Sequence, residues 1–183
     1  MGKGENTEIL VTNSSDETEK AGFNFAKKLQ IGDVICLYGN LGNGKTTFIK
    51  GLAKGLGIKH RIISPTFIIV RSYDLKLGNI SSCNYCHSRE SGNLCRWIPD
   101  QARLAKSKRV GDDKIIFYHA DLYRLSSEND LESIGLQDIL DEENKILAIE
   151  WPEKLGKFMP KNRWEIYFKV LDNDKREIKI KYE

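Results

Sequence analysis

The stretch that decides the fold is Gly39-Asn40-Leu41-Gly42-Asn43-Gly44-Lys45-Thr46. It follows the apolar run 34–38, which predicts a buried strand, and it opens a helical pattern over residues 47–53. A G-x-x-x-x-G-K-[ST] sequence between a strand and a helix indicates a phosphate-binding P-loop rather than a glycine-rich turn that binds nothing. Glycines let the backbone turn tightly with its N–H groups facing inward, and the helix N-terminus adds partial positive charge. Lys45 is then placed to reach the outer phosphates of a nucleotide, and Thr46 to bind Mg²⁺ through its hydroxyl.

Strand and helix patterns alternate along the first part of the chain, whereas strands follow one another at the end. The patterns predict strands at 8–11, 34–38, 67–70 (buried, ending near 73–74), 115–121, 145–150, 164–170 and 176–182. They predict helices from about 18 to 29, from the P-loop to 56–57, and one or two short ones within 128–140, with a turn or short helix at 122–125. The last two strands alternate as a hairpin does, with 172–174 as its turn. We therefore expect an α/β, P-loop NTPase-like three-layer fold with a mixed, mainly parallel sheet and a C-terminal antiparallel hairpin.

Length and composition favour one domain across residues 1–183. No run of 18 apolar residues is present, and the polar N-terminus lacks the apolar core of a signal peptide, so we expect a cytoplasmic protein with no membrane partner. The net charge of +3 is too mild to argue for nucleic-acid binding.

The segment at about 75–114 differs from the rest of the chain in charge, cysteine content and apolar pattern. It holds eight basic and four acidic residues, whereas the remainder has a net charge of −1. We interpret it as an exposed, partly disordered insertion between two strands, with phrases that look like a translated mobile repeat element. Its C-x-x-C-H sequence at 83–87 matches a haem attachment pattern, which we reject because attachment needs export. A zinc site from Cys83, Cys86, His87 and Cys95 is disfavoured because adjacent Cys and His are awkward for tetrahedral ligation.

Two predicted strands end on an acidic residue, and each acid is a candidate partner for the P-loop. A P-loop needs a further carboxylate to hold or position Mg²⁺, and this group commonly ends an apolar strand. Glu150 follows the cleaner apolar run and is assigned to Mg²⁺. Asp121 follows residues 115–120 and is assigned to orienting or deprotonating the attacking water. Each acid alone could instead be a helix cap or a surface carboxylate, but we expect both strands to lie beside the P-loop strand.

Three further residues are open to two interpretations. Thr66, in Ser64-Pro65-Thr66, could belong to a switch segment whose hydroxyl senses the γ-phosphate, or to a simple capped turn. Trp151 could wall the site or be an ordinary core aromatic. Arg124 could be a transition-state cation or the partner of a nearby carboxylate.

Taken together, these phrases resemble the TsaE (YjeE) family of small ATPases required for threonylcarbamoyladenosine modification of tRNA. The resemblance is carried, in order, by the P-loop through Phe48, by Ser64-Pro65-Thr66-Phe67, by His119-Ala120-Asp121-Leu122-Tyr123-Arg124-Leu125 and by Ile149-Glu150-Trp151-Pro152-Glu153. It covers about residues 8–74 and 115–182. The family more often has Asp and Ala where Asn40 and Asn43 stand, and neither position is a ligand through its side chain.

The resemblance implies an ATP site, a magnesium site and a catalytic acid. It implies ATP contacts from Gly39, Gly42, Asn43, Gly44, Lys45, Thr46 and Thr47, with Thr18 and Arg176 also near the nucleotide. Thr46 and Glu150 are implied as Mg²⁺ ligands. Asp121, acting with Lys45, is implied as the catalytic acid position.

The resemblance also implies partners. Family members act with TsaD and TsaB, and therefore on tRNA only through that complex, and hydrolysis is expected to be slow without them. Two other functions stay open from the residues alone. A small-molecule kinase shares the P-loop but needs an acceptor site and usually an arginine-rich lid, and no such lid is evident. A non-catalytic nucleotide-gated module could contact RNA through the basic insertion.

Overall fold

A seven-stranded sheet forms the centre of the computed structural model, which describes residues 7–60, 62–65, 69–75, 115–125, 128–172 and 175–183. Its strands are β1 (Glu8–Thr12), β2 (Val34–Tyr38), β3 (Val70–Leu75), β4 (Ile115–Asp121), β5 (Lys145–Glu150), β6 (Trp164–Val170) and β7 (Arg176–Tyr182). They lie in the order β1-β7-β6-β2-β5-β4-β3. The four central strands are parallel, whereas β3, β7 and β1 run antiparallel to their neighbours. The mixed sheet with a parallel centre and a C-terminal hairpin is therefore confirmed.

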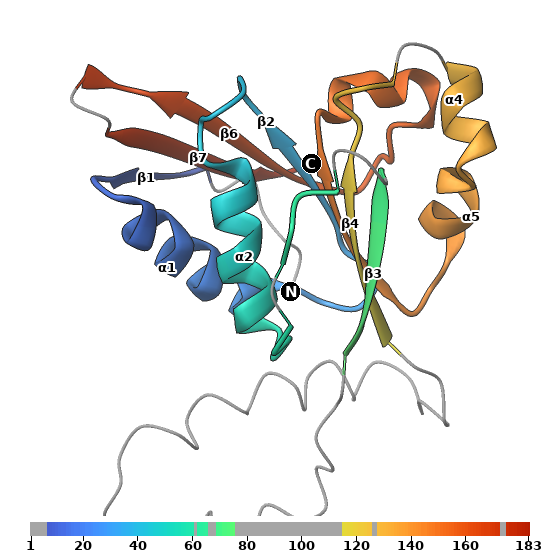
Figure 1. Ribbon diagram of the computed structural model, residues 1–183, viewed down its shortest axis with the longest axis horizontal. Coiled ribbons are helices and arrows are strands. Elements are labelled where there is room, and N and C mark those ends of the chain that lie inside the picture. The colour runs from blue at the N-terminus through green and yellow to red at the C-terminus, as the bar shows by residue number, and fades with distance from the viewer. Residues whose placement is uncertain (1–6, 61, 66–68, 76–114, 126–127, 173–174) are drawn as a thin grey trace, which may run out of the picture.

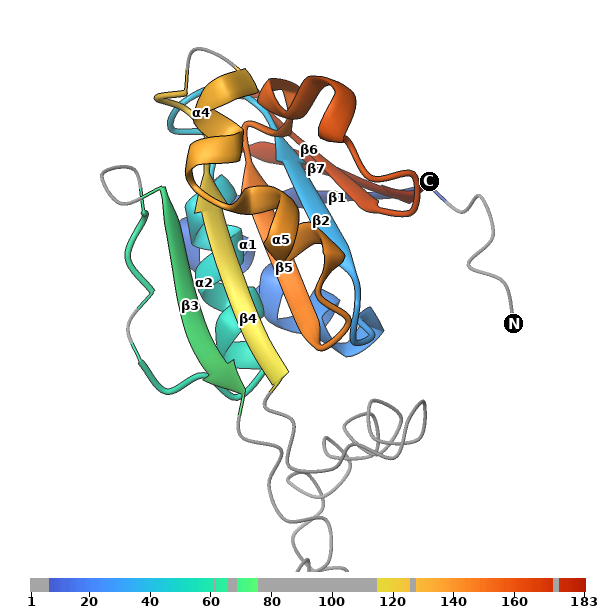
Figure 2. The same ribbon diagram turned by 90° about the vertical axis from the view of Figure 1, so that its right-hand side faces the viewer.

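Helices cover both faces of this sheet, which gives the three predicted layers (Figures 1 and 2). One face is covered by α1 (Ser15–Phe25), the short 3₁₀ turn η1 (Ala26–Lys28) and α2 (Lys45–Gly55), and the other by α4 (Glu128–Ser133), α5 (Leu136–Asp141) and η4 (Pro152–Phe158). Side chains of β2 alternate between the two layers, as a strand buried on both faces requires. Ile35 and Leu37 join the core under α1 and α2, and Val34 and Cys36 join the core on the opposite face.

Helices α1 and α2 pack closely because glycines occupy their contact. A Cβ on Gly51 would lie 1.8 Å from the carbonyl oxygen of Glu19, and one on Gly22 would lie 2.0 Å from that of Phe48. Ser14 caps α1, since its side chain accepts a hydrogen bond from the Glu17 N–H. This packing fixes α2, and with it the P-loop, against the sheet.

Two details of the predicted sheet are wrong. β4 pairs with β3 and β5, so the strand that carries Asp121 is next but one to the P-loop strand rather than beside it. The strand predicted as buried, from 67 to 73–74, is β3, Val70–Leu75, a half-buried edge strand. The apolar run marks where this strand begins, but pairing on only one side leaves it at the edge.

Several predictions fall on residues outside the described ranges. These are the nature of the 76–114 segment, including its zinc and haem interpretations, the position of Thr66, and the centre of the 172–174 turn. Of the helices that the structure describes, none is long and apolar enough to cross a membrane.

Candidate active site

The P-loop follows β2 and ends at the N-terminus of α2, as the sequence predicts. Gly39, Gly42 and Gly44 have φ angles of 135°, 80° and 100°, a region that side chains rarely adopt. A Cβ on Gly39 would also lie 2.6 Å from the carbonyl oxygen of Phe168 on β6. The Asn43 side chain donates a 3.0 Å hydrogen bond to that same oxygen. Asn43 therefore ties the loop to the sheet through its side chain.

Lys45 is the first residue of α2, and it is only 4% exposed. Its ammonium donates hydrogen bonds to the carbonyl oxygens of Gly39 at 2.6 Å and Asn40 at 2.9 Å. The same group lies 4.3 Å from the centre of the Trp151 ring. Burial lowers the Lys45 pKa, against the attraction of nearby carboxylates led by that of Glu150. A poorly hydrated ammonium at the mouth of the loop is well placed to bind an anion.

Thr46 and Glu150 meet beside this lysine. The Thr46 hydroxyl donates a 2.8 Å hydrogen bond to Oε1 of Glu150. The carboxylate also contacts His119, whose Nε2 lies 3.0 Å from the same Oε1. Glu150 is in register with Leu37 of β2 and with Asp121 of β4, so the ends of three strands lie at the same edge of the sheet. This is where an open parallel sheet presents its ligand site.

Asp121 lies at the end of β4 and is buried. Its Oδ2 accepts a 3.1 Å hydrogen bond from the Ser64 hydroxyl, and its Oδ1 accepts one of 3.1 Å from the Tyr123 N–H. Although β4 is not adjacent to β2, Asp121 reaches the same cleft as Glu150 because their positions are in register across β4 and β5.

The cleft in front of these groups has a volume of about 180 Å³. P-loop residues, both acids and two aromatic side chains surround it: Leu41, Gly42, Gly44, Lys45, Thr46, Thr47, Ser64, Asp121, Tyr123, Glu150 and Trp151. Trp151 has a φ of 61°, uncommon for a bulky side chain, and its ring packs 5.1 Å from that of Tyr123. Trp151 therefore lies in the cleft wall and also packs against the core.

The comparisons with known proteins decide the family. The model for the threonylcarbamoyl adenosine biosynthesis protein TsaE matches residues 12–87 and 106–178. The chain belongs to the TsaE family. Residues 88–105, which the family model leaves unmatched, lie within the predicted insertion. TsaE proteins are involved in tRNA threonylcarbamoyladenosine biosynthesis.

Individual relatives of the TsaE family match nearly the whole chain. The tRNA threonylcarbamoyladenosine biosynthesis protein TsaE of Borreliella burgdorferi is 34% identical over 160 residues, which cover 85% of this chain and 89% of the relative. That of Treponema pallidum is 31% identical over 170 residues, covering 93% and 97%. The crystal structure of Bacillus subtilis YdiB superposes with a TM-score of 0.64 at 25% identity, covering 99% of this chain and 88% of that one.

Two residues that the TsaE resemblance places near a nucleotide lie next to Gly44 of the P-loop. A Cβ on Gly44 would lie 3.2 Å from Cδ of Arg176 and 3.4 Å from Cγ2 of Thr18. Thr18 is fully buried, and its hydroxyl is hydrogen bonded to the Ser14 carbonyl oxygen and to Thr12. Neither residue is among those described as lining the 180 Å³ cleft.

Arg124 is exposed in the turn after Asp121 and is also absent from the described lining of that cleft. Whether it acts as a transition-state cation stays a prediction.

Four residues at the candidate site were not predicted as individual contributors. They are Leu41, Tyr123, His119 and Ser64, which was noted only as part of the Ser64-Pro65-Thr66 segment. His119 carried a usable signal, because strand residues two apart face the same way and His119 stands two before Asp121. Tyr123 is an exposed aromatic two residues after the acid. Leu41 is an exposed apolar residue within the glycine loop and had no comparable signal.

The donor atoms at Thr46 and Glu150 fit Mg²⁺. Both are oxygens, which Mg²⁺ prefers, and Mg²⁺ is commonly held by one or two carboxylates together with substrate phosphates. Among the described residues no group of three or more His, Cys, Asp or Glu forms a self-contained metal site. The oxygens of Thr46 and Glu150 therefore suit an ion that is held together with substrate phosphates.

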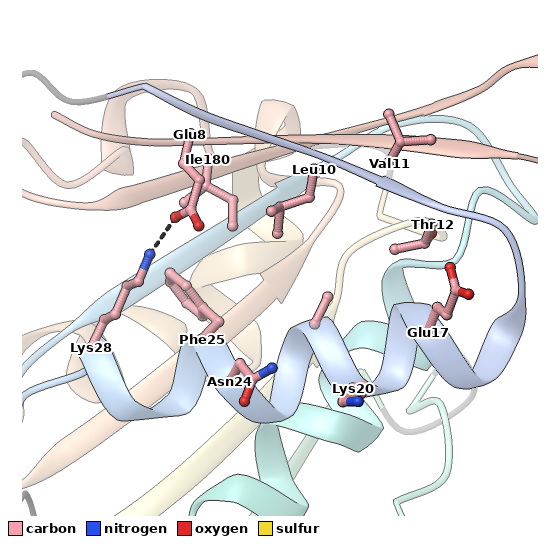
Figure 3. Close-up of a pocket in the computed structure, with 11 residues that line it drawn as sticks. Glu8, Leu10, Val11, Thr12, Glu17, Lys20, Asn24, Phe25, Lys28 and Ile180 are labelled. Atoms are coloured by element: carbon pink, nitrogen blue, oxygen red, sulfur yellow. Dashed lines mark hydrogen bonds and ion pairs between the residues drawn. The ribbon is translucent and has the colours of Figure 1, made fainter.

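A second cleft, of about 290 Å³, lies between β1 and α1 and shares no lining residue with the first (Figure 3). Leu10, Phe25 and Ile180 line its interior, and the Lys28–Glu8 ion pair closes one end. Its polar groups are peripheral, so it offers no comparable constellation for chemistry. One link to the P-loop region is the hydrogen bond between Thr12, which lines this cleft, and Thr18.

Proposed function

We propose that this TsaE-family chain is a Mg²⁺-dependent ATPase that supports threonylcarbamoyladenosine modification of tRNA in the cytoplasm by acting on a TsaD–TsaB complex. The observation that carries the proposal is the convergence of Lys45, Thr46, Asp121 and Glu150 on one cleft at the end of the parallel strands. Slow turnover by the chain alone, accelerated by the partners, is part of the proposal.

Each residue has a separate task in the proposed reaction. The P-loop N–H groups and the Lys45 ammonium bind and orient the phosphates. Thr46 and Glu150 hold Mg²⁺, which neutralises phosphate charge when bound. Asp121 orients a water and accepts its proton as the water oxygen bonds to the γ-phosphorus and the bond to the leaving ADP oxygen breaks. Hydrogen bonds from Ser64 and from the Tyr123 N–H hold the Asp121 carboxylate in place for this task.

The decisive experiment is phosphate release from ATP by the intact chain, alone and with purified TsaB and TsaD, for the wild type and Asp121→Asn. Loss of a general base typically lowers kcat by about 10²- to 10⁴-fold, so D121N is expected to bind ATP normally and to turn over within that range below the wild type. Asp138→Asn, an exposed substitution of the same kind on α5, is the control.

The outcomes separate the three candidate functions. Phosphate transfer to a small-molecule acceptor in place of water would establish a kinase. Full support of tRNA modification by D121N without turnover would establish a nucleotide-gated module. Absence of ATP turnover by the wild type even with both partners would overturn the proposal.

A further inference from the structure

His119 is a fully buried polar residue on β4, between the edge strand β3 and β5. It lies on β4 opposite Ala148 of β5, between strands whose other inward residues are mostly apolar. Its Nε2 lies 3.0 Å from Oε1 of Glu150. Burial of an imidazole costs free energy unless a polar partner compensates for the lost hydration, and the Glu150 carboxylate is that partner.

The two ring nitrogens of His119 have different surroundings. An ionised carboxylate only accepts hydrogen bonds, so the nitrogen that faces Glu150 must carry the proton. The other nitrogen, Nδ1, is buried with no hydrogen-bond partner among the described residues. The contact with Glu150 therefore requires the ring to carry its proton on Nε2.

Among the described residues, the side-chain contacts of the Glu150 carboxylate converge on Oε1. The Thr46 hydroxyl donates to this oxygen, and Nε2 of His119 lies 3.0 Å from it. Two donors from different elements, α2 and β4, hold the flexible side chain in one rotamer. The other carboxylate oxygen, Oε2, belongs to the same residue, and Glu150 lines the cleft.

We infer that His119 is a positioning residue, which fixes the Glu150 carboxylate so that it can hold a divalent cation beside Thr46. The inference rests on the proposed function, because it concerns the same Mg²⁺ site. Groups that hydrogen bond to metal ligands pre-orient them, and their loss typically weakens metal affinity by about 10- to 100-fold. His119 is fully buried and is not among the residues described as lining the cleft, so in this inference it acts through Glu150.

A matched pair of substitutions separates positioning from packing. Gln and Met have similar length and volume, but only His119→Gln keeps an N–H donor that can reach Oε1. The measurement is ATP affinity by calorimetry as a function of Mg²⁺ concentration, with unfolding by urea as the stability control. H119Q is expected to require nearly the wild-type Mg²⁺ concentration, and H119M about 10- to 100-fold more. Equal Mg²⁺ dependence in H119M and the wild type would overturn the inference.

A second comparison tests whether His119 acts through Glu150. In a Glu150→Gln background, H119M is expected to cause no further change in Mg²⁺ dependence, because the group that it positions has been altered. An undiminished effect of H119M in that background would show a general packing defect and overturn the inference.

A third measurement uses the unmodified side chain, so it does not depend on whether H119M folds. The ring ¹⁵N chemical shifts of His119, assigned against variants of the two other histidines of the chain, His60 and His87, are expected to report a proton on Nε2. A ring protonated on Nδ1 alone could not donate to Glu150 and would overturn the inference. If wild-type ATP binding showed no dependence on Mg²⁺, the proposed function would fail and this inference with it. If only the expected results for the His119 variants and ring shifts failed to appear, the proposed function would be unaffected.

Discussion

Thr46 and Glu150 stand 104 positions apart in the chain, yet the Thr46 hydroxyl donates a 2.8 Å hydrogen bond to Oε1 of Glu150. This bond joins the first turn of α2 to the end of β5, the two elements on which the proposed Mg²⁺ site depends. It brings together two of the oxygens that are proposed to hold Mg²⁺. Such pre-organisation reduces the side-chain ordering that binding would otherwise require.

The Thr46–Glu150 pair predicts coupled effects on Mg²⁺ use. Thr46→Val removes the hydroxyl, and Glu150→Gln removes the charge of the carboxylate. Each is expected to raise the Mg²⁺ concentration needed for tight ATP binding by at least about 10-fold. Because the residues form one unit, the double variant is expected to show less than the product of the single effects. Titration of Mg²⁺ at fixed ATP, followed by calorimetry, measures all four proteins.

Glu132→Gln on the exposed side of α4 is the matched control and should leave the titration unchanged. Effects of T46V and E150Q that multiply fully would contradict a shared site.

The buried ammonium of Lys45 predicts that nucleotide affinity and stability respond differently to its removal. Lys45→Met deletes the cation that is proposed to bind phosphate, and a charge-assisted hydrogen bond contributes about 1.5–3 kcal/mol, so ATP affinity should fall by roughly 10- to 100-fold or more. Burial already disfavours the charged form and lowers its pKa, so the free energy of unfolding should fall little or rise. Calorimetry and urea unfolding provide the two measurements.

Lys54→Met, on the exposed side of the same helix, is expected to change neither quantity by more than about 1 kcal/mol. If K45M lowered the free energy of unfolding by as much as it weakened the free energy of ATP binding, Lys45 would be mainly structural.

Local patterns in the sequence were sufficient to predict the P-loop, β5 with Glu150 at its end, and the closing hairpin. Each depends on neighbours within a few residues: glycines before a lysine, an apolar run, and a period of two. The family match and the fold confirm the chain-level prediction that these elements supported.

Strand order could not be predicted in the same way. The runs 115–121 and 145–150 both have the pattern of a buried strand, and nothing local shows that, of these two, it is 145–150 that pairs with β2. Pairing is decided by contacts between residues far apart in the chain. The position of His119 two residues before Asp121 indicated that both side chains face the same way, but the contact of His119 with Glu150 depends on the pairing of β4 with β5 and could not be read from the sequence.

The glycine contact between α1 and α2 predicts that Gly51→Ala destabilises the protein. In an open helix this change would favour folding by up to about 1 kcal/mol. Here the new Cβ would lie 1.8 Å from the carbonyl oxygen of Glu19, and backbone cannot move as a flexible side chain can. We expect a loss of about 1–3 kcal/mol, or several degrees in Tm, measured by urea and thermal unfolding.

Lys50→Ala, one position earlier on α2, adds the same alanine without this contact and should stay within about 0.5 kcal/mol of the wild type. A G51A protein that is more stable than the wild type would show that the helices separate easily, and that the P-loop helix is less firmly held than the structure indicates.

The groups around the Glu165 carboxylate predict how the stability of the protein depends on pH. This carboxylate is buried on β6, where Arg163, Lys181 and the hydroxyls of Tyr167 and Tyr38 surround it. Burial alone would raise the Glu165 pKa, but the hydrogen bonds from Tyr167, Lys181 and Arg163 outweigh it and lower the pKa to about 2. A lowered pKa stabilises the fold at any pH above the unfolded value near 4.5, and this stabilisation is lost as the pH falls from there toward 2.

Glu165→Gln should remove both the stabilisation and its pH dependence. At pH 7 the variant is expected to lose about 3 kcal/mol of unfolding free energy, since it breaks a buried charge cluster. Between pH 4.5 and 2.5 the wild type should lose stability more steeply than E165Q, so the two curves should converge as the solution becomes acidic. Urea unfolding at pH 7, 4.5, 3.5 and 2.5 measures the convergence, with Glu132→Gln as the exposed control. Parallel curves across this range would show that the Glu165 carboxylate titrates equally in the folded and unfolded chains, and that Arg163 and Lys181 do not stabilise its charge.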